Sequence, residues 1–255
     1  MDTNFIVVIP FYNAQKWITK SIKSLMLQEY KNFRCIVIDD CSTDYSYEAA
    51  TSLIEKDDRF RIVKTDKNVG PLANVYNGPM KYMNDGHDND VVVVLDGDDF
   101  LYSNKTLSIL NEYYKNKDCW MTYGSYINLS NKQRGKFSNQ VPNNVIDGNL
   151  FRQFRWTTSH LRSYRMFLLR NINKEDLLDS NGNFLRAAGD LALMFPLLEM
   201  SGHRAKFVKE ILYIWNDLNT LNEHKVLRDD QLECEKKIRN GKKYDRLILG
   251  EQNDS

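Results

Sequence analysis

The chain has 255 residues, and its 35 lysines and arginines against 34 aspartates and glutamates give a formal net charge of +1. Hydrophobic residues at 42% and charged residues at 27% are ordinary values for a globular protein and exclude a disordered or fibrous chain. A near-zero net charge provides no overall attraction to nucleic acid, so we expect no nucleic-acid partner.

The chain shows no segment that predicts secretion or membrane insertion. The N-terminus lacks the basic and apolar regions of a secretory signal, and the longest uncharged apolar run, Val91–Leu95, is far too short to span a bilayer. The four cysteines form no CxxC pair, which excludes the common zinc and thioredoxin spacings. We expect a cytoplasmic protein without a transmembrane segment, and leave open its oligomeric state and a peripheral contact with a membrane.

Short apolar runs alternate with segments of helical periodicity in the N-terminal part of the chain. Continuous apolar runs predict strands buried on both faces, and these are Phe5–Ile9, Phe33–Ile38, Arg61–Lys64 and Asp90–Leu95. Helices are predicted between them over Ala14–Gln28, Tyr45–Glu55 and Pro71–Met83, the last with a disturbance at Pro79. This order predicts an α/β fold, a single domain whose central, mostly parallel sheet is flanked by helices.

The remaining chain is less regular. Further elements are predicted as a helix over Lys105–Lys115, a strand over Trp120–Tyr126, a long surface connection over Asn128–Asn149, a helix over Asp190–Met200, and strands over Ala205–Val208 and Ile211–Trp215. From Asn222 the chain is predicted to be helical and then polar. We divide the domain into a ligand-binding half (1–126), a second half that completes the site (127–221), and a C-terminal helix with a polar tail (222–255).

Polar residues follow three of the predicted strands at the point where each strand ends. They are Pro10-Phe-Tyr-Asn13, Asp39-Asp40 and Asp96-Gly-Asp-Asp99. In a parallel sheet ligands bind beyond the carboxyl ends of the strands, so these segments predict one binding site. Neither a GxGxxG nor a GxxxxGK[ST] motif follows the first strand, which excludes the dinucleotide fingerprint and the P-loop.

Three carboxylates are crowded after the fourth strand. Asp96, Asp98 and Asp99 repel one another unless a cation or hydrogen-bond donors compensate their charge. Such hard oxygen ligands suit Mn²⁺ or Mg²⁺, which in turn suit a diphosphate. Gly97 would let the backbone approach a ligand closely. The alternative is an ordinary turn with solvated carboxylates, because Asp and Gly are common turn residues.

The motifs occur in a recognisable order. They are Val8-Ile-Pro-Phe-Tyr-Asn13, Ser24-Leu-Met-Leu-Gln28, Ile36-Val-Ile-Asp-Asp-Cys-Ser-Thr-Asp44, Asn68-Val-Gly70 and Leu95-Asp-Gly-Asp-Asp99. The set resembles the nucleotide-sugar half of family 2 glycosyltransferases with the Rossmann-like GT-A fold, closely over residues 4–126 and loosely beyond. Cys41 departs from the family, which usually has Gly or Asn there. A Cys is tolerated at this position unless the backbone needs a positive φ.

The resemblance implies a nucleotide-binding role for Pro10, Tyr12, Asn13 and Asn68, with an aromatic ring available to stack on a base. Asp40 matches the carboxylate that accepts a hydrogen bond from uracil, which implies a UDP-sugar donor. The alternative for Asp40 is a helix cap.

The resemblance also implies a metal site with Mn²⁺ or Mg²⁺ as cofactor. Asp98 and Asp99 match the pair that the family shares between the ribose and the metal–diphosphate, and Asp96 belongs to the wider acidic motif. Which of Asp98 and Asp99 ligates the metal directly is left open. His224 matches a late histidine that some relatives use as a third contact to the metal or diphosphate, the alternative being a surface helix residue.

Members of the family invert configuration in a single displacement, using an acidic residue near the start of a helix in the second half. Ala187-Ala-Gly-Asp190 stands before an apolar helical stretch, so the resemblance assigns the catalytic base to Asp190. The alternative is a plain N-cap, for which Asp is equally suited.

The acceptor is predicted to bind beside Trp156, His160 and Arg162. No acidic residue lies between Asp147 and Glu175, whereas arginines are frequent there. This stretch could hold an acceptor sugar or touch the leaving phosphate. A solvated face and a contact with an anionic membrane are the alternatives.

Together these features predict a metal-dependent, inverting glycosyltransferase that moves a sugar from a UDP-sugar to a hydroxyl group of a glycan, lipid-linked or protein acceptor. One alternative is a sugar nucleotidyltransferase, which needs a glycine-rich basic loop after the first strand, where this chain has no glycine. The other is a degenerate transferase that acts as a non-enzymatic carbohydrate- or nucleotide-binding module.

Overall fold

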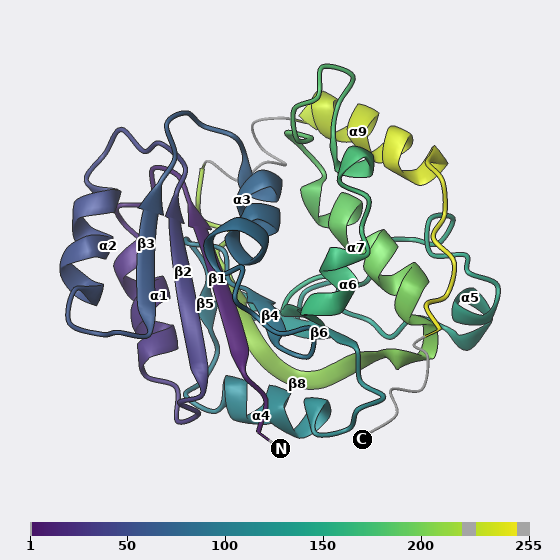
Figure 1. Cartoon of the computed structure of the whole chain (residues 1–255), viewed down its shortest axis with the longest axis horizontal. Coiled ribbons are helices and arrows are strands. Elements are labelled where there is room, and N and C mark those ends of the chain that lie inside the picture. Colours follow the sequence, from purple (N-terminus) through teal and green to yellow (C-terminus); the bar gives the residue numbers. More distant parts are fainter. Residues whose placement is uncertain (1, 221–227, 249–255) are drawn as a thin grey trace.

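The computed structural model describes residues 2–220 and 228–248. Its framework is an eight-stranded sheet with the strand order β3-β2-β1-β4-β7-β6-β8-β5 (Figure 1). The strands are β1 (Phe5–Phe11), β2 (Phe33–Asp39), β3 (Phe60–Lys64), β4 (Val91–Val94), β5 (Phe100–Leu101), β6 (Met121–Asn128), β7 (Arg162–Arg165) and β8 (Ala205–Trp215). One sheet therefore runs through both proposed halves of the domain, whose boundaries stay a prediction.

The direction of the strands changes across the sheet. Strands β3, β2, β1 and β4 are parallel to one another, while β7 is antiparallel to both β4 and β6. Strand β8 is parallel to β6 and antiparallel to β5. The four parallel strands are those predicted from the apolar runs, and their carboxyl ends meet at one edge of the sheet, as expected.

The helices cover both faces of the sheet, so the predicted α/β architecture is confirmed. They are α1 (Ile18–Met26), α2 (Ser46–Ile54), α3 (Pro71–Asn77), α4 (Thr106–Tyr114), α5 (Asn143–Asp147), α6 (Met166–Arg170), α7 (Gly189–Ser201) and α9 (Arg228–Asn240). No helix in the described ranges is both long and apolar enough to cross a bilayer.

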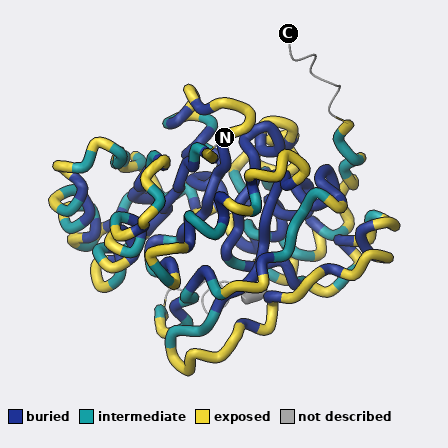
Figure 2. The backbone as a smooth tube through the Cα atoms, turned by 90° about the horizontal axis from the view of Figure 1, so that it is seen from below, coloured by how far each residue is buried: buried dark blue, intermediate teal, exposed yellow. Residues whose placement is uncertain are grey.

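Alternate residues of each central strand belong to different cores. In β1, Ile6 and Val8 pack in the core beneath α3 and α7, whereas Phe5, Val7 and Ile9 pack in the core beneath α1, α2 and α4. Because side chains of a strand point alternately to opposite faces, a strand covered on both faces has to be apolar throughout. Figure 2 shows a buried centre of the molecule with exposed segments around it.

The structure corrects several predicted elements. The helix predicted over Pro71–Met83 ends at Asn77 and continues as a π-helical turn, Gly78–Tyr82, which contains Pro79, so the disturbance predicted at this proline is confirmed. Proline lacks the N–H needed for the regular helical ladder, which explains the change of winding. The two strands predicted between Ala205 and Trp215 form one strand, β8.

The connection predicted over Asn128–Asn149 is not wholly a surface segment. It contains α5, whose Val145 and Ile146 are buried in the core together with Val141. Strands β5 and β7 and helix α6 were not predicted, because they have only 2, 4 and 5 residues, too few to show a period.

Candidate active site at the carboxyl ends of the strands

The loops after β1 and β2 are joined by hydrogen bonds. The backbone N–H of Asn13 donates to Ser42 Oγ at 2.9 Å, and Asn13 Oδ1 accepts from the backbone N–H of Thr43 at 2.8 Å. Asn13 and Cys41 both have positive φ, at 47° and 63°. Tyr12 is 42% exposed beside this junction, so its ring is accessible to a ligand. These loops therefore form a fixed rim at the edge of the sheet.

Asp40 organises the loop before α3. Its carboxylate accepts from the backbone N–H groups of Val69 at 2.9 Å and Gly70 at 2.8 Å and from Thr65 Oγ1 at 3.2 Å. The Asn68 side chain donates to the Asp40 carbonyl at 3.2 Å. Asp40 is only 3% exposed. A carboxylate has capacity for further donors, so its role toward uracil stays a prediction.

Gly97 lies where the acidic segment meets the end of β1. Its N–H donates to the Pro10 carbonyl at 2.9 Å, and a Cβ at this position would lie 2.5 Å from Phe11 Cβ. No other residue fits without displacing β1. The space on the Cβ side of Gly97 is filled by the chain itself, and the expected close approach of its backbone to a ligand stays a prediction. Gly97 thus allows the end of β1 to lie against the acidic cluster.

The acidic cluster is held by side chains that arrive at the end of β8. Asp99 accepts from the Tyr213 hydroxyl and from the backbone N–H of Asn216, both at 2.7 Å. Asp98 accepts from the Asn219 side chain at 2.7 Å. These donors stand more than a hundred residues away in the chain and were not identified as site residues from the sequence. A signal was present, since the predicted strand ends in the asparagine-rich segment Asn216–Asn219.

The donors do not fully compensate for the crowding of the carboxylates. Burial, with a contribution from the charge of Asp96, raises the pKa of Asp98 to about 6. Burial and the charges of Asp98 and Asp96 raise the pKa of Asp99 well above its ordinary value. A carboxyl group with a raised pKa lacks favourable interactions for its charged form. The cluster therefore favours a cation.

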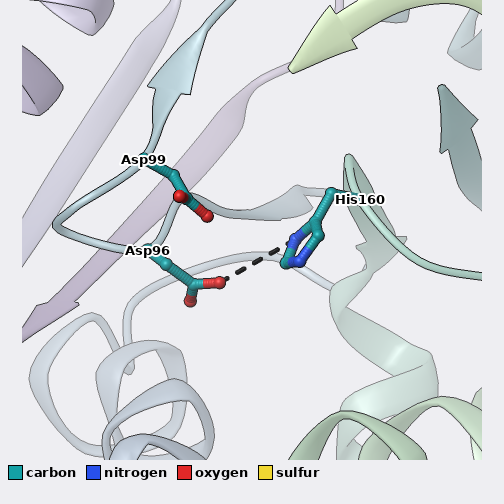
Figure 3. Close-up of side chains that lie close together, drawn as sticks. All are labelled: Asp96, Asp99 and His160. Carbon is teal, nitrogen blue, oxygen red and sulfur yellow. Dashed lines mark ion pairs between the residues drawn. The ribbon is translucent and has the colours of Figure 1, made fainter. Parts of the chain in front are cut away.

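His160 completes a set of three ligand-type side chains. Its ring stacks on Tyr213 with centroids 4.6 Å apart, and its Nδ1 lies 3.8 Å from Asp96 Oδ2 (Figure 3). Burial and the charge of Arg162 lower the pKa of His160 well below its ordinary value, so the imidazole is neutral and the contact is not a salt bridge. Nδ1 is buried and has no hydrogen-bond partner in the described part of the chain.

This set fits a divalent cation. One ligand atom each from Asp96, Asp99 and His160 lies within 4.8 Å of the others, and Figure 3 shows the three side chains directed toward one another. Two carboxylates and a neutral imidazole are suitable ligands for Mn²⁺. The set differs from the predicted one: it contains Asp96 and His160, while His224 lies outside the described residues.

Arg162 lies between the acidic cluster and the predicted base. Its guanidinium donates to Asp96 Oδ2 at 3.0 Å. Burial disfavours the charge of Arg162, but the carboxylates of Asp96 and Asp190 outweigh it, and the pKa of Arg162 is raised. In this structure Arg162 therefore contacts the acidic cluster, and its predicted contact with the acceptor stays a prediction.

Asp190 stands in the first turn of α7, as predicted. The residue before the helix, Ala188, has a φ of 54°, and Gly189 packs so closely on Leu72 of α3 that a Cβ there would lie 2.9 Å from Leu72 Cβ. Burial raises the pKa of Asp190, and the charge of Arg162 opposes this rise. Asp190 Oδ1 accepts from the backbone N–H of Leu191, so the side chain also has a local, cap-like contact.

The arginine-rich stretch does not form one exposed basic face. Arg152 makes a buried, bidentate ion pair with Glu199 of α7, at 2.6 and 2.9 Å. Arg165 is buried and donates to the carbonyls of Cys119 and Tyr114. The reading as a basic acceptor or membrane surface is therefore wrong for these two arginines, because their partners come from distant parts of the chain. Trp156 packs edge-on against Phe195 of α7, and its acceptor role stays a prediction.

Strained backbone gathers around the same edge. Of the non-glycine residues with positive φ in the described ranges, Asn13, Cys41 and Ala188 each stand in a loop or turn that carries a candidate site residue. Such conformations cost about 1–3 kcal/mol each and persist where surrounding structure fixes them, commonly at functional sites.

The chain resembles a known protein family over most of its length. The sequence profile of "Glycosyl transferase family 2" matches residues 6–176. An uncharacterized glycosyltransferase of Haemophilus influenzae is 36% identical over 120 residues, which cover 47% of this chain and 46% of the relative. One of Rickettsia conorii is 33% identical over 156 residues, covering 60% of this chain and 24% of the relative. The chain thus spans about a quarter to a half of the length of these relatives.

A longer match is to the UDP-Glc:alpha-D-GlcNAc-diphosphoundecaprenol beta-1,3-glucosyltransferase WfgD of Escherichia coli, which is 26% identical and covers 87% of this chain and 88% of the relative. Among solved structures, S. aureus TarS 1–349 in complex with UDP-GlcNAc has a TM-score of 0.63 at 19% identity, covering 84% of this chain and 59% of that one.

The mannosyltransferase PcManGT of Pyrobaculum calidifontis, in complex with GDP-Man and Mn2+, has a TM-score of 0.61 at 16% identity, covering 96% of this chain and 66% of that one. Likenesses at this identity establish the fold. The profile match over most of the chain shows that the protein belongs to glycosyl transferase family 2, and these structures show that it has the GT-A fold.

Proposed function

We propose that the protein is a metal-dependent, inverting glycosyltransferase that uses a UDP-sugar as donor. The observation that carries the proposal is the convergence of three features at one sheet edge: the loops after β1 and β2, the acidic segment after β4, and Asp190 at the start of α7. Arg162 carries the electrostatic link between Asp96 and Asp190. A donor between these features would have its nucleotide at the first two loops and its anomeric carbon near Asp190.

The reaction is a single displacement. The acceptor hydroxyl oxygen forms a bond to the anomeric carbon, and the bond between that carbon and the diphosphate oxygen breaks. The hydroxyl proton passes to Asp190, whose ionised form accepts it. Attack from the side opposite to the leaving group inverts the configuration.

Asp99 would hold the metal together with Asp98 or with Asp96 and His160. A bound Mn²⁺ or Mg²⁺ would act as a Lewis acid that stabilises charge on the diphosphate. Two observations support such a site: burial raises the pKa of Asp98 despite its hydrogen bond from Asn219, and Nδ1 of His160 is buried without a hydrogen-bond partner in the described part of the chain.

One curated relative and one solved structure support UDP as the nucleotide. The E. coli relative is named for UDP-Glc, and TarS was solved with UDP-GlcNAc, whereas the Pyrobaculum mannosyltransferase was solved with GDP-Man. The acceptor is a hydroxyl group of a glycan, lipid-linked or protein molecule, and the name of the E. coli relative supports the lipid-linked class. Asp40, Tyr12, Pro10, Asn13 and Asn68 are proposed to line the nucleotide pocket.

The proposal is tested by the thermal shift that UDP and GDP cause in the presence of Mn²⁺, followed by hydrolysis assays with UDP-glucose, UDP-galactose and their N-acetylated forms. We expect stabilisation by UDP, and loss of hydrolysis in Asp98→Asn and Asp99→Asn. No shift with UDP, together with unchanged hydrolysis in both variants, would overturn the proposal. UDP binding without hydrolysis or transfer on any acceptor would favour the non-enzymatic binding module.

A further inference from the structure

Arg186 is an exposed arginine in the segment that leads into α7, between Leu185 and the turn that carries Asp190. Its guanidinium Nη1 donates to the carbonyl oxygen of Asn68 at 3.1 Å. Its Cδ lies 3.9 Å from the position that a Cβ on Gly70 would occupy, so its aliphatic stem runs along the backbone of that loop. The contact joins two segments that are 118 residues apart in the chain.

The charge of Arg186 has no carboxylate partner in residues 2–220 and 228–248. None of the ion pairs found there includes this arginine. A guanidinium carries five N–H donors, and one of them is directed to a neutral carbonyl. Most of its donors therefore face solvent at the surface of the site.

Arg186 lies between two parts of the candidate site. On one side Asn68 and Gly70 belong to the loop wrapped around the Asp40 carboxylate, which is proposed to hold the nucleotide. On the other side the chain continues after three residues into Asp190, and Gly189 is pressed against α3. Arg186 thus stands at the seam between the nucleotide-binding loop and the turn that carries the proposed base.

We propose that Arg186 binds the phosphate groups of the nucleotide-sugar donor across this seam, an inference that rests on the proposed function. Arginine forms paired, charge-assisted hydrogen bonds with phosphate oxygens. Because Arg186 is exposed and has no carboxylate partner in the described residues, no ion pair has to break before it binds a phosphate. As the bond to the sugar breaks, the leaving diphosphate gains negative charge, and the fixed charge of Arg186 stabilises it. The same contact would hold the turn of Asp190 against the nucleotide loop.

The test compares the affinities of uridine and UDP by isothermal titration calorimetry at a fixed Mn²⁺ concentration. The variants are Arg186→Gln and Arg186→Lys. Arg61→Gln is the matched control, because Arg61 is also exposed and also donates to one backbone carbonyl, that of Tyr82 at 2.9 Å, away from the site. Melting temperatures of all variants verify folding.

We expect Arg186→Gln to weaken UDP binding about 10–100-fold while uridine affinity stays within about twofold. Arg186→Lys should restore part of the loss, since it keeps the charge but not the planar fork, and Arg61→Gln should bind UDP as the unmodified protein does. Equal losses for uridine and UDP would overturn the inference in favour of a base contact or a loop effect. Unchanged UDP affinity in Arg186→Gln would overturn the inference and leave the proposed function standing. If the unmodified protein bound no UDP, the proposed function would fail and the inference with it.

Discussion

Two sets of carboxylates lie at the same edge of the sheet, and the protein holds them differently. Asp40 receives backbone N–H groups from Val69 and Gly70, which come from one neighbouring loop. The acids after β4 are crowded against one another, and the pKa of Asp98 is raised to about 6 by burial. The first arrangement uses a charge to order a loop. The second leaves charges that the protein alone does not compensate.

This difference distinguishes carboxylates that stabilise the structure of the site from carboxylates that take part in the reaction. Removing a carboxylate of the first kind leaves buried N–H groups without acceptors, which destabilises the fold. Neutralising one of the second kind removes a buried, poorly compensated charge, which stabilises the fold while the reaction is lost. Substitutions in the two sets are therefore expected to have opposite effects on the free energy of unfolding.

The largest effect is expected for Asp190, the proposed base. Asp190→Asn should lower kcat by about 10²–10⁴-fold, because the variant cannot take up the acceptor proton. UDP affinity should change by less than about twofold, since no nucleotide contact is assigned to this side chain. Steady-state kinetics and calorimetry give the two values. Parallel losses of UDP affinity and kcat would show that Asp190 acts only as a cap of α7.

Asp40 is expected to be required for stability, in contrast to the crowded carboxylates after β4. Asp40→Ala should lower the free energy of unfolding by about 3 kcal/mol, because the N–H groups of Val69 and Gly70 lose their acceptor. UDP affinity should fall with it as the loop loosens. Urea denaturation provides the measurement, with the exposed Asp66→Ala as control. If both variants were equally stable, the ordering role of Asp40 would be refuted.

Asp98 should show a gain in stability. Because its folded pKa is above the unfolded value, its protonated form favours the fold; this contribution is present below about pH 4 and is lost as the pH rises through about 6. Without metal, Asp98→Asn should thus be about 1–3 kcal/mol more stable than the unmodified protein at pH 7.5, with the gain vanishing near pH 4.

Urea denaturation with a chelator at several pH values measures this gain. Added Mn²⁺ should reduce it, since only the unmodified site has its full charge to bind the cation. If Asp98→Asn were less stable than the unmodified protein at pH 7.5, Asp98 would be a carboxylate that the fold requires, as Asp40 is expected to be.

The four parallel strands were predictable because each has a local signal. An unbroken apolar run such as Val91–Val94 identifies a strand covered on both faces, and parallel strands bring their ends together without further information. That is why Asp40 and Asp96–Asp99 could be placed at one edge from the sequence.

Other parts of the second half could not be predicted in this way, because their structure depends on distant partners. Strand β7 is the sequence Arg-Ser-Tyr-Arg, which has no apolar period, yet it is buried in the sheet because Arg165 donates to the carbonyl of Cys119 and to that of Tyr114. The donors to Asp99 come from Tyr213 and Asn216 in the same long-range manner.

The smallest predicted effect concerns Cys41, the residue that departs from the family pattern. Its φ of 63° is the left-handed conformation in which a Cβ is unfavourable, so the condition set from the sequence for tolerating a cysteine is not met. Cys41→Gly should raise the free energy of unfolding by about 0.5–1 kcal/mol, the removed strain being partly offset by the greater freedom of glycine in the unfolded chain.

Cys41→Ala separates backbone strain from the loss of the thiol, because it keeps the Cβ and should therefore show no gain. Urea denaturation under reducing conditions distinguishes the two variants. An equal gain in both would assign the effect to the thiol, which lies 3.8 Å from the Asp66 carbonyl. A gain in Cys41→Gly alone, with weaker UDP binding, would mean that the strained backbone keeps the loops after β1 and β2 in their binding geometry.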